Sequence, residues 1–200
     1  AKEPKAKRCK YRKLARLGGG YLSDIYLTTS RSALGIRRLR ILKELKELKA
    51  ELFDTPRFVA LLEEEARLAH RLKHPNIKRT FEKQLHGKRR YFVREYLDGC
   101  TLEQLREAQR TSDRLTQEAQ LEIISEALSG IHYAHTLKDV YGEPLDLIHR
   151  NLNARNIFIS YDGRVKVLGF GVAQTRRNAA PTPPGMGDGL VRHMAPEAIL

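Results

Sequence analysis

The spacing of apolar residues along the chain predicts short strands in hairpins, alternating with a few longer helices. Runs of β-branched, aliphatic and aromatic residues a few positions long are separated by turns that contain glycine. An Asp-Gly pair in one of these turns, Asp162-Gly163, is the most specific of these hairpin signals. Three hairpins are expected, across residues 11–27, 77–96 and 157–168.

Apolar residues three and four positions apart predict helices in the intervening segments. A first helix is expected to begin at Asp54-Thr55-Pro56, where a capping side chain precedes proline, and to end before Pro75. A shorter helix is expected over residues 102–110, and Thr116 can cap a long one over residues 117–137. The apolar face expected on the long helix consists of Leu121, Ile124, Leu128, Ile131 and Ala134.

The most informative stretch contains His149-Arg150-Asn151, then Asn153 and Asn156, and ends in Gly169-Phe170-Gly171. It resembles the catalytic and metal-binding loops of the eukaryotic-type protein kinase family, H-R-D-x-x-x-x-N followed by D-F-G, and bacterial serine/threonine kinases most of all. Asn151 stands at the catalytic Asp position, and Gly169 at the metal-binding Asp position. Asn153 stands where the family usually has a lysine. The resemblance implies a kinase-like chain without its two chemical carboxylates.

The first glycine turn resembles the Gly-rich loop of the same family, G-x-G-x-x-G-x-V. Gly18 and Gly20 match the first two glycines, where a bare backbone can approach phosphate oxygens closely. Ser23 replaces the third glycine and Ile25 stands for the valine. Taken alone, three consecutive glycines more often mark an ordinary hairpin turn.

Residues 36–52 allow two interpretations. Leucines at three- and four-residue intervals favour an amphipathic helix, on which Lys43 is an exposed lysine. The resemblance favours a strand over residues 39–42 that ends at Lys43, with a helix only from Glu44. In that interpretation, which we follow, Lys43 would hold nucleotide phosphates.

The resemblance assigns roles to residues on either side of the second hairpin. Glu65 best matches the helix glutamate that pairs with the strand lysine, with the two preceding glutamates as adjacent competitors. Glu95 and Leu97 lie where the hinge beside the adenine pocket begins. Arg94 falls at or beside the gatekeeper position behind that pocket. Either it is buried against a carboxylate such as Glu65 or a water-filled space, or a one-residue shift places it on the surface.

The resemblance implies an α+β, bilobal protein-kinase-like fold. Residues 1–10 are expected as a disordered basic lead-in, and residues 11–97 as an N-lobe with an antiparallel sheet and one main helix. Residues 98–200 are expected as an incomplete, mostly helical C-lobe that reaches through the activation segment. Ala195-Pro196-Glu197 resembles the end of that segment, so the chain is expected to stop before the remaining helices.

Composition adds a strong positive charge to this picture. The 37 Lys and Arg residues outnumber the 24 Asp and Glu residues by 13. A solvated surface with a basic tail is the simplest interpretation, and attraction to nucleic acid or to another anionic partner is the alternative. Cys9 and Cys100 are expected as free thiols in a reducing compartment, and no apolar run approaches the ~18 residues that span a bilayer. We therefore expect a cytoplasmic location.

The replaced residues bear directly on chemistry. Asn151 cannot take a proton at neutral pH, although a positioned base typically contributes ~10²–10⁴-fold to a rate. Gly169 offers no side-chain oxygen to magnesium, which leaves Asn156 as a lone, weak candidate ligand. We therefore expect ATP binding that is weak or independent of metal, and we do not expect Mg²⁺ binding.

The leading hypothesis from the sequence is a pseudokinase with a signalling or scaffold role. Its expected partners are signalling proteins, with an active kinase as one candidate, and nucleic acid is not favoured as a partner. One alternative is a residual serine/threonine protein kinase that transfers the ATP γ-phosphate, with Asp162 or Asp188 binding the metal. A second alternative is a basic module that binds nucleic acid or anionic partners.

Overall fold

The computed structural model describes residues 10–19, 23–32, 34–45, 67–86, 89–109 and 114–170. The chain divides into two compact units. Each unit consists of two stretches of the chain, because residues 60–79 of the second unit lie between the two stretches of the first. The first unit draws on residues 1–59 and 80–96, and the second on residues 60–79 and 97–200.

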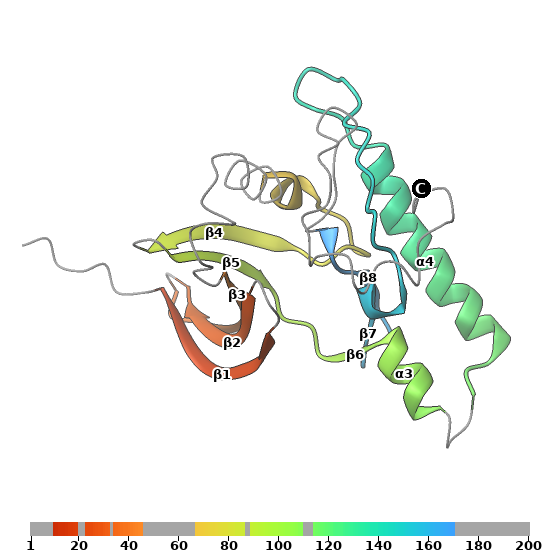
Figure 1. The fold of residues 1–200 in the computed structure, drawn as a ribbon, viewed down its shortest axis with the longest axis horizontal. Helices are drawn as coiled ribbons and strands as arrows, with labels where there is room; N and C mark the ends of the chain where they lie inside the picture. Colours follow the sequence, from red (N-terminus) through yellow and green to blue (C-terminus); the bar gives the residue numbers. More distant parts are fainter. Residues whose placement is uncertain are drawn as a thin grey trace, which may run out of the picture. The chain divides into compact units, whose positions relative to one another are not determined.

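Five antiparallel strands form one sheet in the first unit, in the order β1-β2-β3-β5-β4 (Figure 1). The first two hairpins expected from the sequence are confirmed, because β1 pairs with β2 and β4 pairs with β5. The second hairpin begins at Thr80, three residues later than expected. The bounds are β1 Tyr11–Gly19, β2 Ser23–Arg31, β3 Arg37–Leu45, β4 Thr80–His86 and β5 Arg89–Glu95.

Strand β3 is longer than the sequence indicated. It continues past Lys43 to Leu45, with Glu44 opposite Asp24 and Leu45 opposite Ser23 on β2. The prediction of a helix beginning at Glu44 is therefore wrong, because pairing along the full length of β2 prevails over the leucine periodicity. The rest of that predicted helix lies outside the described residues.

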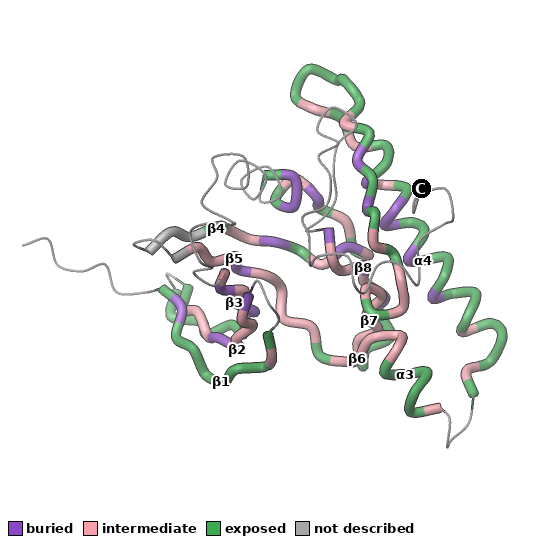
Figure 2. Tube along the Cα trace, in the orientation of Figure 1, coloured by how far each residue is buried: buried purple, intermediate pink, exposed green. Residues whose placement is uncertain are grey.

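The core of the first unit is small and aromatic. Tyr11, Leu42 and Val93 are buried, and Tyr26, Phe81 and Tyr91 pack against them. The ammonium group of Lys13 lies 3.9 Å from the centre of the Tyr26 ring and forms an ion pair with Glu44. Figure 2 shows that buried positions gather on β3 and β5, whereas β1 is mostly exposed. The sheet therefore leaves much of the β1 surface to solvent.

The second unit combines helices with a three-stranded sheet of order β6-β7-β8. Its hairpin β7–β8 confirms the third hairpin expected from the sequence, and Gly163 in the turn has φ +85°. Thr116 caps the long helix as predicted, because its hydroxyl accepts from the Ala119 N–H at 3.3 Å. The bounds are β6 Gly99–Thr101, α3 Leu102–Ala108, α4 Gln117–His135, a 3₁₀ turn η1 Ala154–Asn156, β7 Ile157–Ser160 and β8 Val165–Val167.

Helix α4 buries a different face from the one expected. Leu121, Ile124 and Leu128, which belong to the apolar face expected from the sequence, are 62%, 51% and 54% exposed. Ile131 and Ala134 are buried, as expected. The buried face consists of Ile123, Ala127, Gly130, Ile131 and Ala134.

The core of the second unit joins this face of α4 to β8 and to the segment before β4. Residues 67–71 are helical and residues 72–74 are not, so the predicted helix ends before Pro75 as expected, and its part before residue 67 lies outside the described residues. Ile77 forms an isolated bridge with Val167. The other buried residues of this core are Leu68, Leu72, Ile77, Leu147, Val165, Val167 and Phe170.

Candidate functional site

His149 fixes the position of the loop that follows it. Its ring is 4% exposed, and its Nε2 lies 2.7 Å from the carbonyl oxygen of Leu168, so Nε2 donates there. Its Nδ1 accepts from the backbone N–H of Asn151 at 3.2 Å. These two bonds define a neutral imidazole with its proton on Nε2. Burial lowers the pKa of His149, and the hydrogen bond to Leu168 opposes this effect. The lowered pKa keeps the ring neutral near pH 7.

Phe170 completes this scaffold from the other side. Its ring meets that of His149 edge to face, with centroids 4.5 Å apart and planes at 73°. Phe170 is 7% exposed and belongs to the core of the second unit. The backbone of Leu168 is held twice, by His149 at its carbonyl and by the Asn156 carbonyl, which accepts from the Leu168 N–H at 2.7 Å. The two motifs recognised in the sequence are therefore joined by direct hydrogen bonds.

Three asparagine side chains fill the positions where the family has its chemical groups. The Asn153 side chain donates to the Asn151 side-chain oxygen at 2.6 Å and to the Asn151 carbonyl at 3.2 Å. The Asn156 side chain donates to the same carbonyl at 2.8 Å. The Asn153 oxygen also accepts from the Arg155 N–H at 2.9 Å and so caps η1. The sequence-predicted residues 151, 153 and 156 thus form one network of neutral amides.

Gly169 lies against this network. Its φ is +83°, a conformation that glycine adopts without strain. A Cβ atom at this position would lie 2.7 Å from Oδ1 and 2.9 Å from Cγ of Asn156. Since real Cβ atoms do not approach that closely, an Asp side chain at position 169 would displace Asn156 from its place. The Asn156 amide occupies the space that a side chain at position 169 would need.

Asp162, one of the two carboxylates considered as a metal ligand, lies at the turn of the β7–β8 hairpin. Asp162 is in the exposed turn, where it accepts from the Ser160 hydroxyl and pairs with Arg164 at 3.2 Å. The Ser160 hydrogen bond lowers its pKa. Asn156 precedes β7, and a four-residue strand extends about 13 Å. Asp162 is therefore too far along the hairpin to share a metal with Asn156, and Asp188 lies outside the described residues.

In the first unit, the pairing register aligns three of the predicted nucleotide-binding residues. Gly18 on β1 lies opposite Ile25 on β2, and Ile25 lies opposite Lys43 on β3. Ser23 is buried at the start of β2, opposite Leu45. Lys43 also lies opposite Phe92 and makes interactions within the chain. Gly20 and Glu65 were predicted for the same site, but they lie outside the described residues.

The residues of the predicted hinge lie at the end of the inner strand β5 and just after it. Arg94 lies between Ile41 on β3 and Thr80 on β4 and is half-buried, so the alternative that placed it on the surface is wrong. Its guanidinium carbon is 5.9 Å from the centre of the Phe92 ring. Glu95 ends β5, and Leu97 begins the second of the two stretches that form the second unit. Both are half-buried.

The sequence analysis missed the polar pair that anchors β8. The Asn76 side chain donates to the Glu126 carboxylate at 2.9 Å and to the Val165 carbonyl at 3.0 Å. The same Glu126 oxygen accepts from the Val165 N–H at 3.1 Å. A glutamate between buried Ile123 and Gly130 on α4 was the available signal, because a carboxylate beside a buried face needs partners.

A family model of the protein kinase domain matches residues 11–200. The chain belongs to the protein kinase family. The tyrosine-protein kinase MasK of Myxococcus xanthus is 33% identical over 183 residues, which cover 91% of this chain and 28% of that protein. Serine/threonine-protein kinase PknA of Mycobacterium tuberculosis is 31% identical over 160 residues, which cover 78% of this chain and 35% of that protein. These matches confirm the family prediction, including its bacterial relatives.

Solved kinase structures share the fold. The crystal structure of the Mycobacterium tuberculosis PknI kinase domain has a TM-score of 0.62 and 23% identity, and the match covers 87% of this chain and 64% of that one. The predicted α+β, bilobal kinase-like fold is confirmed by this likeness. The kinase chain described here spans 27–35% of the length of the curated relatives it matches.

Protein kinases use ATP as phosphate donor, typically with Mg²⁺ held by the Asp of the metal-binding loop and the Asn of the catalytic loop. Here the corresponding pair is Gly169, which has no side-chain oxygen, and Asn156, whose side-chain oxygen belongs to a neutral amide. Mg²⁺ is usually bound through carboxylates together with phosphates. The donor set at these two positions therefore does not fit magnesium.

Among the residues that the structure describes, no three His, Cys, Asp or Glu side chains gather as a metal site. No helix found there is long and apolar enough to cross a membrane. Cys100 is a half-buried free thiol, and Cys9 lies outside the described residues.

Proposed function

We propose that this kinase-family chain is a pseudokinase, a signalling or scaffold module that acts through its conformation and its partners and does not transfer phosphate. One observation carries the proposal. The Asn151, Asn153 and Asn156 side chains hydrogen-bond within the loop, and Asn156 fills the space beside Gly169. Neutral amides cannot replace a base or a metal-binding carboxylate.

The first unit supports a limited role for nucleotide. Gly18, Ile25 and Lys43 are aligned across three strands, and this alignment supports a shared role for them in holding phosphates. Lys43 would contact the phosphates, and Ser23, Gly20, Glu65, Glu95 and Leu97 remain predicted contributors. With two carboxylates absent, repulsion of an ATP polyanion is reduced, so ATP would bind weakly and without metal. Asn156 would not recruit Mg²⁺ by itself.

A paired experiment tests this function. Purified chain is incubated with radiolabelled ATP and either Mg²⁺ or Mn²⁺, and label is followed in the chain and in a generic protein substrate. We expect no incorporation above that of Lys43→Ala. Incorporation that depends on metal and disappears in Lys43→Ala would overturn the proposal.

A thermal-shift titration then examines nucleotide binding separately. If ATP binds without metal, the rise in melting temperature is the same with EDTA and with Mg²⁺, and it is lost in Lys43→Ala. Saturating ligand stabilises the folded state by RT ln(1 + [L]/Kd), which is about 2.7 kcal/mol at 100 times Kd. A rise that requires Mg²⁺ would contradict metal-independent binding.

The second candidate is a residual protein kinase, and the printed names of the relatives favour it. MasK is called a tyrosine-protein kinase, and PknB and PknA are called serine/threonine-protein kinases. Such an activity would need a metal ligand other than Asp162, because that residue lies at the exposed hairpin turn. The radiolabel assay distinguishes the two candidates. If label is incorporated, phosphoamino acid analysis identifies the acceptor residue.

The proposed partners are proteins of a signalling pathway, with an active kinase as one candidate, and the proposed location is the cytoplasm. The proposed partners follow from the family and from the absence of the chemical carboxylates at positions 151 and 169, and the proposed location follows from the two cysteines expected as free thiols.

A further inference from the structure

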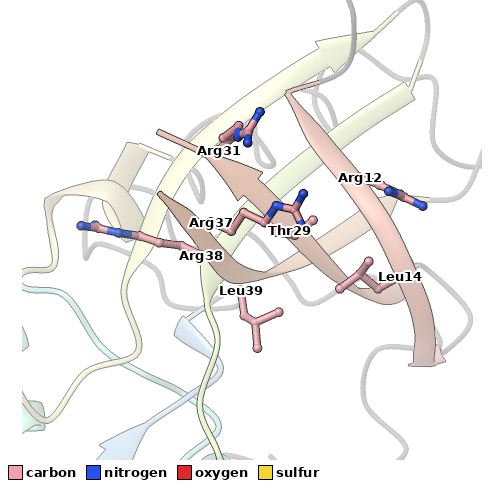
Figure 3. A pocket seen from close by; sticks show the side chains of 7 residues that line it. All are labelled: Arg12, Leu14, Thr29, Arg31, Arg37, Arg38 and Leu39. Atoms are coloured by element: carbon pink, nitrogen blue, oxygen red, sulfur yellow. The ribbon is translucent and has the colours of Figure 1, made fainter. Parts of the chain in front are cut away.

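A groove on one face of the first unit's sheet combines arginine with exposed leucine. It encloses about 370 Å³ over β1, β2 and β3. Figure 3 shows Leu14 and Leu39 together at its lower end in that view, with the guanidinium groups of Arg12, Arg31 and Arg37 above them. The lining residues are Arg12, Leu14, Thr29, Arg31, Arg37, Arg38 and Leu39.

The pairing register explains why these side chains meet. Thr29 on β2 lies opposite Arg12 on β1 and opposite Leu39 on β3, so the three residues form a row across the sheet. Two residues nearer the β2–β3 turn, Arg31 lies directly opposite Arg37. Like charges that face each other across a strand pair are destabilising. An anion placed between these two residues would remove that repulsion.

Within the part of the chain that the structure describes, no carboxylate balances the positive charge of the groove. Among the residues that the structure describes, none of its four arginines forms an ion pair. Arg31 donates from Nε to the Gly35 carbonyl at 3.3 Å, which leaves its charge unneutralised. By contrast, Arg16 further along β1 is paired with Asp24 at 2.9 Å. The groove therefore presents planar, multiply donating cations to solvent.

Leu14 and Leu39 give this charged groove an apolar end. They are 50% and 42% exposed; Leu14 is the unpaired residue at a bulge in β1, and Leu39 is paired with Thr29 within β3. An apolar side chain from a ligand would cover them, while carboxylates could bind the arginines in the paired geometry that guanidinium groups favour. The groove thus matches a ligand that carries both kinds of group on one short segment.

We propose that this groove binds an acidic segment of a partner protein, in which two or more Asp or Glu residues flank a leucine-like residue. Single-stranded RNA is less well matched, because none of the described residues that line the groove is aromatic and able to stack on bases. A bilayer is less well matched because the leucines lie within a hollow. The inference is independent of the proposed function, since a catalytically active kinase could use the same surface.

The test measures binding of a fluorescein-labelled peptide of alternating Asp and Glu with one central leucine, by fluorescence anisotropy on the 200-residue chain. Arg31→Gln/Arg37→Gln should weaken binding about tenfold or more, which corresponds to about 1.4 kcal/mol. The matched control is Arg106→Gln/Arg114→Gln, which removes the same charge from exposed positions in the second unit and should change binding less than twofold. Leu39→Ser should weaken binding of the peptide with the central leucine. It should not weaken binding of a peptide in which serine replaces that leucine.

Several results would overturn the proposal. One is equal weakening by the two arginine pairs, because net charge alone would then explain binding. Another is equal affinity for the leucine and serine peptides. A third is tighter, Arg37-dependent binding of oligouridine or of phosphatidylserine vesicles than of the peptide. Circular dichroism melts establish that each variant is folded. If the double variant is unfolded, the single variant Arg37→Gln is measured by the same criteria, with Arg106→Gln as its control.

Discussion

The two sides of the loop between His149 and Phe170 differ in what their polar atoms do. On the scaffold side, His149 bonds to the Leu168 carbonyl and packs against Phe170, both buried. On the chemical side, the amides of Asn151, Asn153 and Asn156 bond to the loop itself. One side holds the two kinase motifs together, and the three side chains named on the other side are neutral amides.

This difference shows that the loop's shape does not depend on its carboxylates. The His149 imidazole is anchored by backbone groups at both nitrogens, so neither anchor requires an Asp at position 151 or 169. The chemical side can then change its residue types while the fold persists. The variants below therefore address the scaffold side first and the chemical side afterwards.

Removing the Phe170 ring should have the largest effect. Phe170→Ala leaves a cavity beside His149 in the core of the second unit and should lower the free energy of unfolding by about 3–5 kcal/mol. Urea denaturation measures the change. Tyr161→Ala, which removes an aromatic ring that is 80% exposed, is the control and should stay within about 0.5 kcal/mol. Similar losses for the two variants would show that the scaffold side is not structurally important.

Restoring a side chain at the metal-binding position should have the next largest effect. Gly169→Asp forces a Cβ against Asn156 at a φ of +83° and should cost about 1–3 kcal/mol. Gly163→Asp is the control, because Gly163 has φ +85° but open space around it. The difference in free energy between the two variants isolates the contact with Asn156.

The same contact can be tested by a double-mutant cycle. In an Asn156→Ala background, Gly169→Asp should cost less, with a coupling of about 0.5 kcal/mol or more. Additive effects would mean that Asn156 does not occupy the space required by a side chain at position 169.

The sequence predicted where the elements and motifs lie better than which faces they bury. Thr116 and the Asp-Gly turn are local signals, and both were confirmed. On α4, two sets of residues have helical spacing, and the sequence does not say which one meets a neighbour. The structure buries the set that includes Gly130, where an added Cβ would lie 2.9 Å from the Asn76 carbonyl. Close approach selects the smaller residues, and that contact is not local in sequence.

The candidate site shows the same limit. The order of the motifs identified positions 151, 153, 156 and 169, because each is fixed by spacing from His149 or Phe170. The mutual bonding of the amides was not predictable, since it depends on the η1 turn and on the backbone angle at Gly169. Glu126 was missed for a similar reason, because its partners Asn76 and Val165 are far from it in sequence.

Acid should weaken the scaffold side by a smaller amount than the core substitution. Burial lowers the pKa of His149 in the folded chain, so the unfolded chain binds more protons near pH 6.5. Stability is therefore full above about pH 6.5 and falls as the pH drops below it, by at most about 1.4 kcal/mol per pH unit for one proton.

Urea denaturation at several pH values between about 7.5 and 5.5 measures this slope. His149→Gln should remove most of it, and the remainder includes His74, whose pKa is lowered by burial and by the charge of Lys166. His132→Gln, at an exposed position on α4, is the control and should keep the full slope. An unchanged slope in His149→Gln would show that His149 does not titrate differently on folding.

The smallest effect on stability is expected for Asn151→Asp. A carboxylate oxygen can still accept the bond that the Asn153 side chain donates at 2.6 Å, so the free energy of unfolding should change by less than about 0.5 kcal/mol. The variant restores the base position of the loop but leaves Gly169 without a metal ligand. We therefore expect no phosphate incorporation in the radiolabel assay, with the unmodified chain as control. Metal-dependent incorporation by Asn151→Asp alone would mean that the glycine at position 169 does not prevent phosphate transfer. The lack of activity would then be due to residue 151 alone.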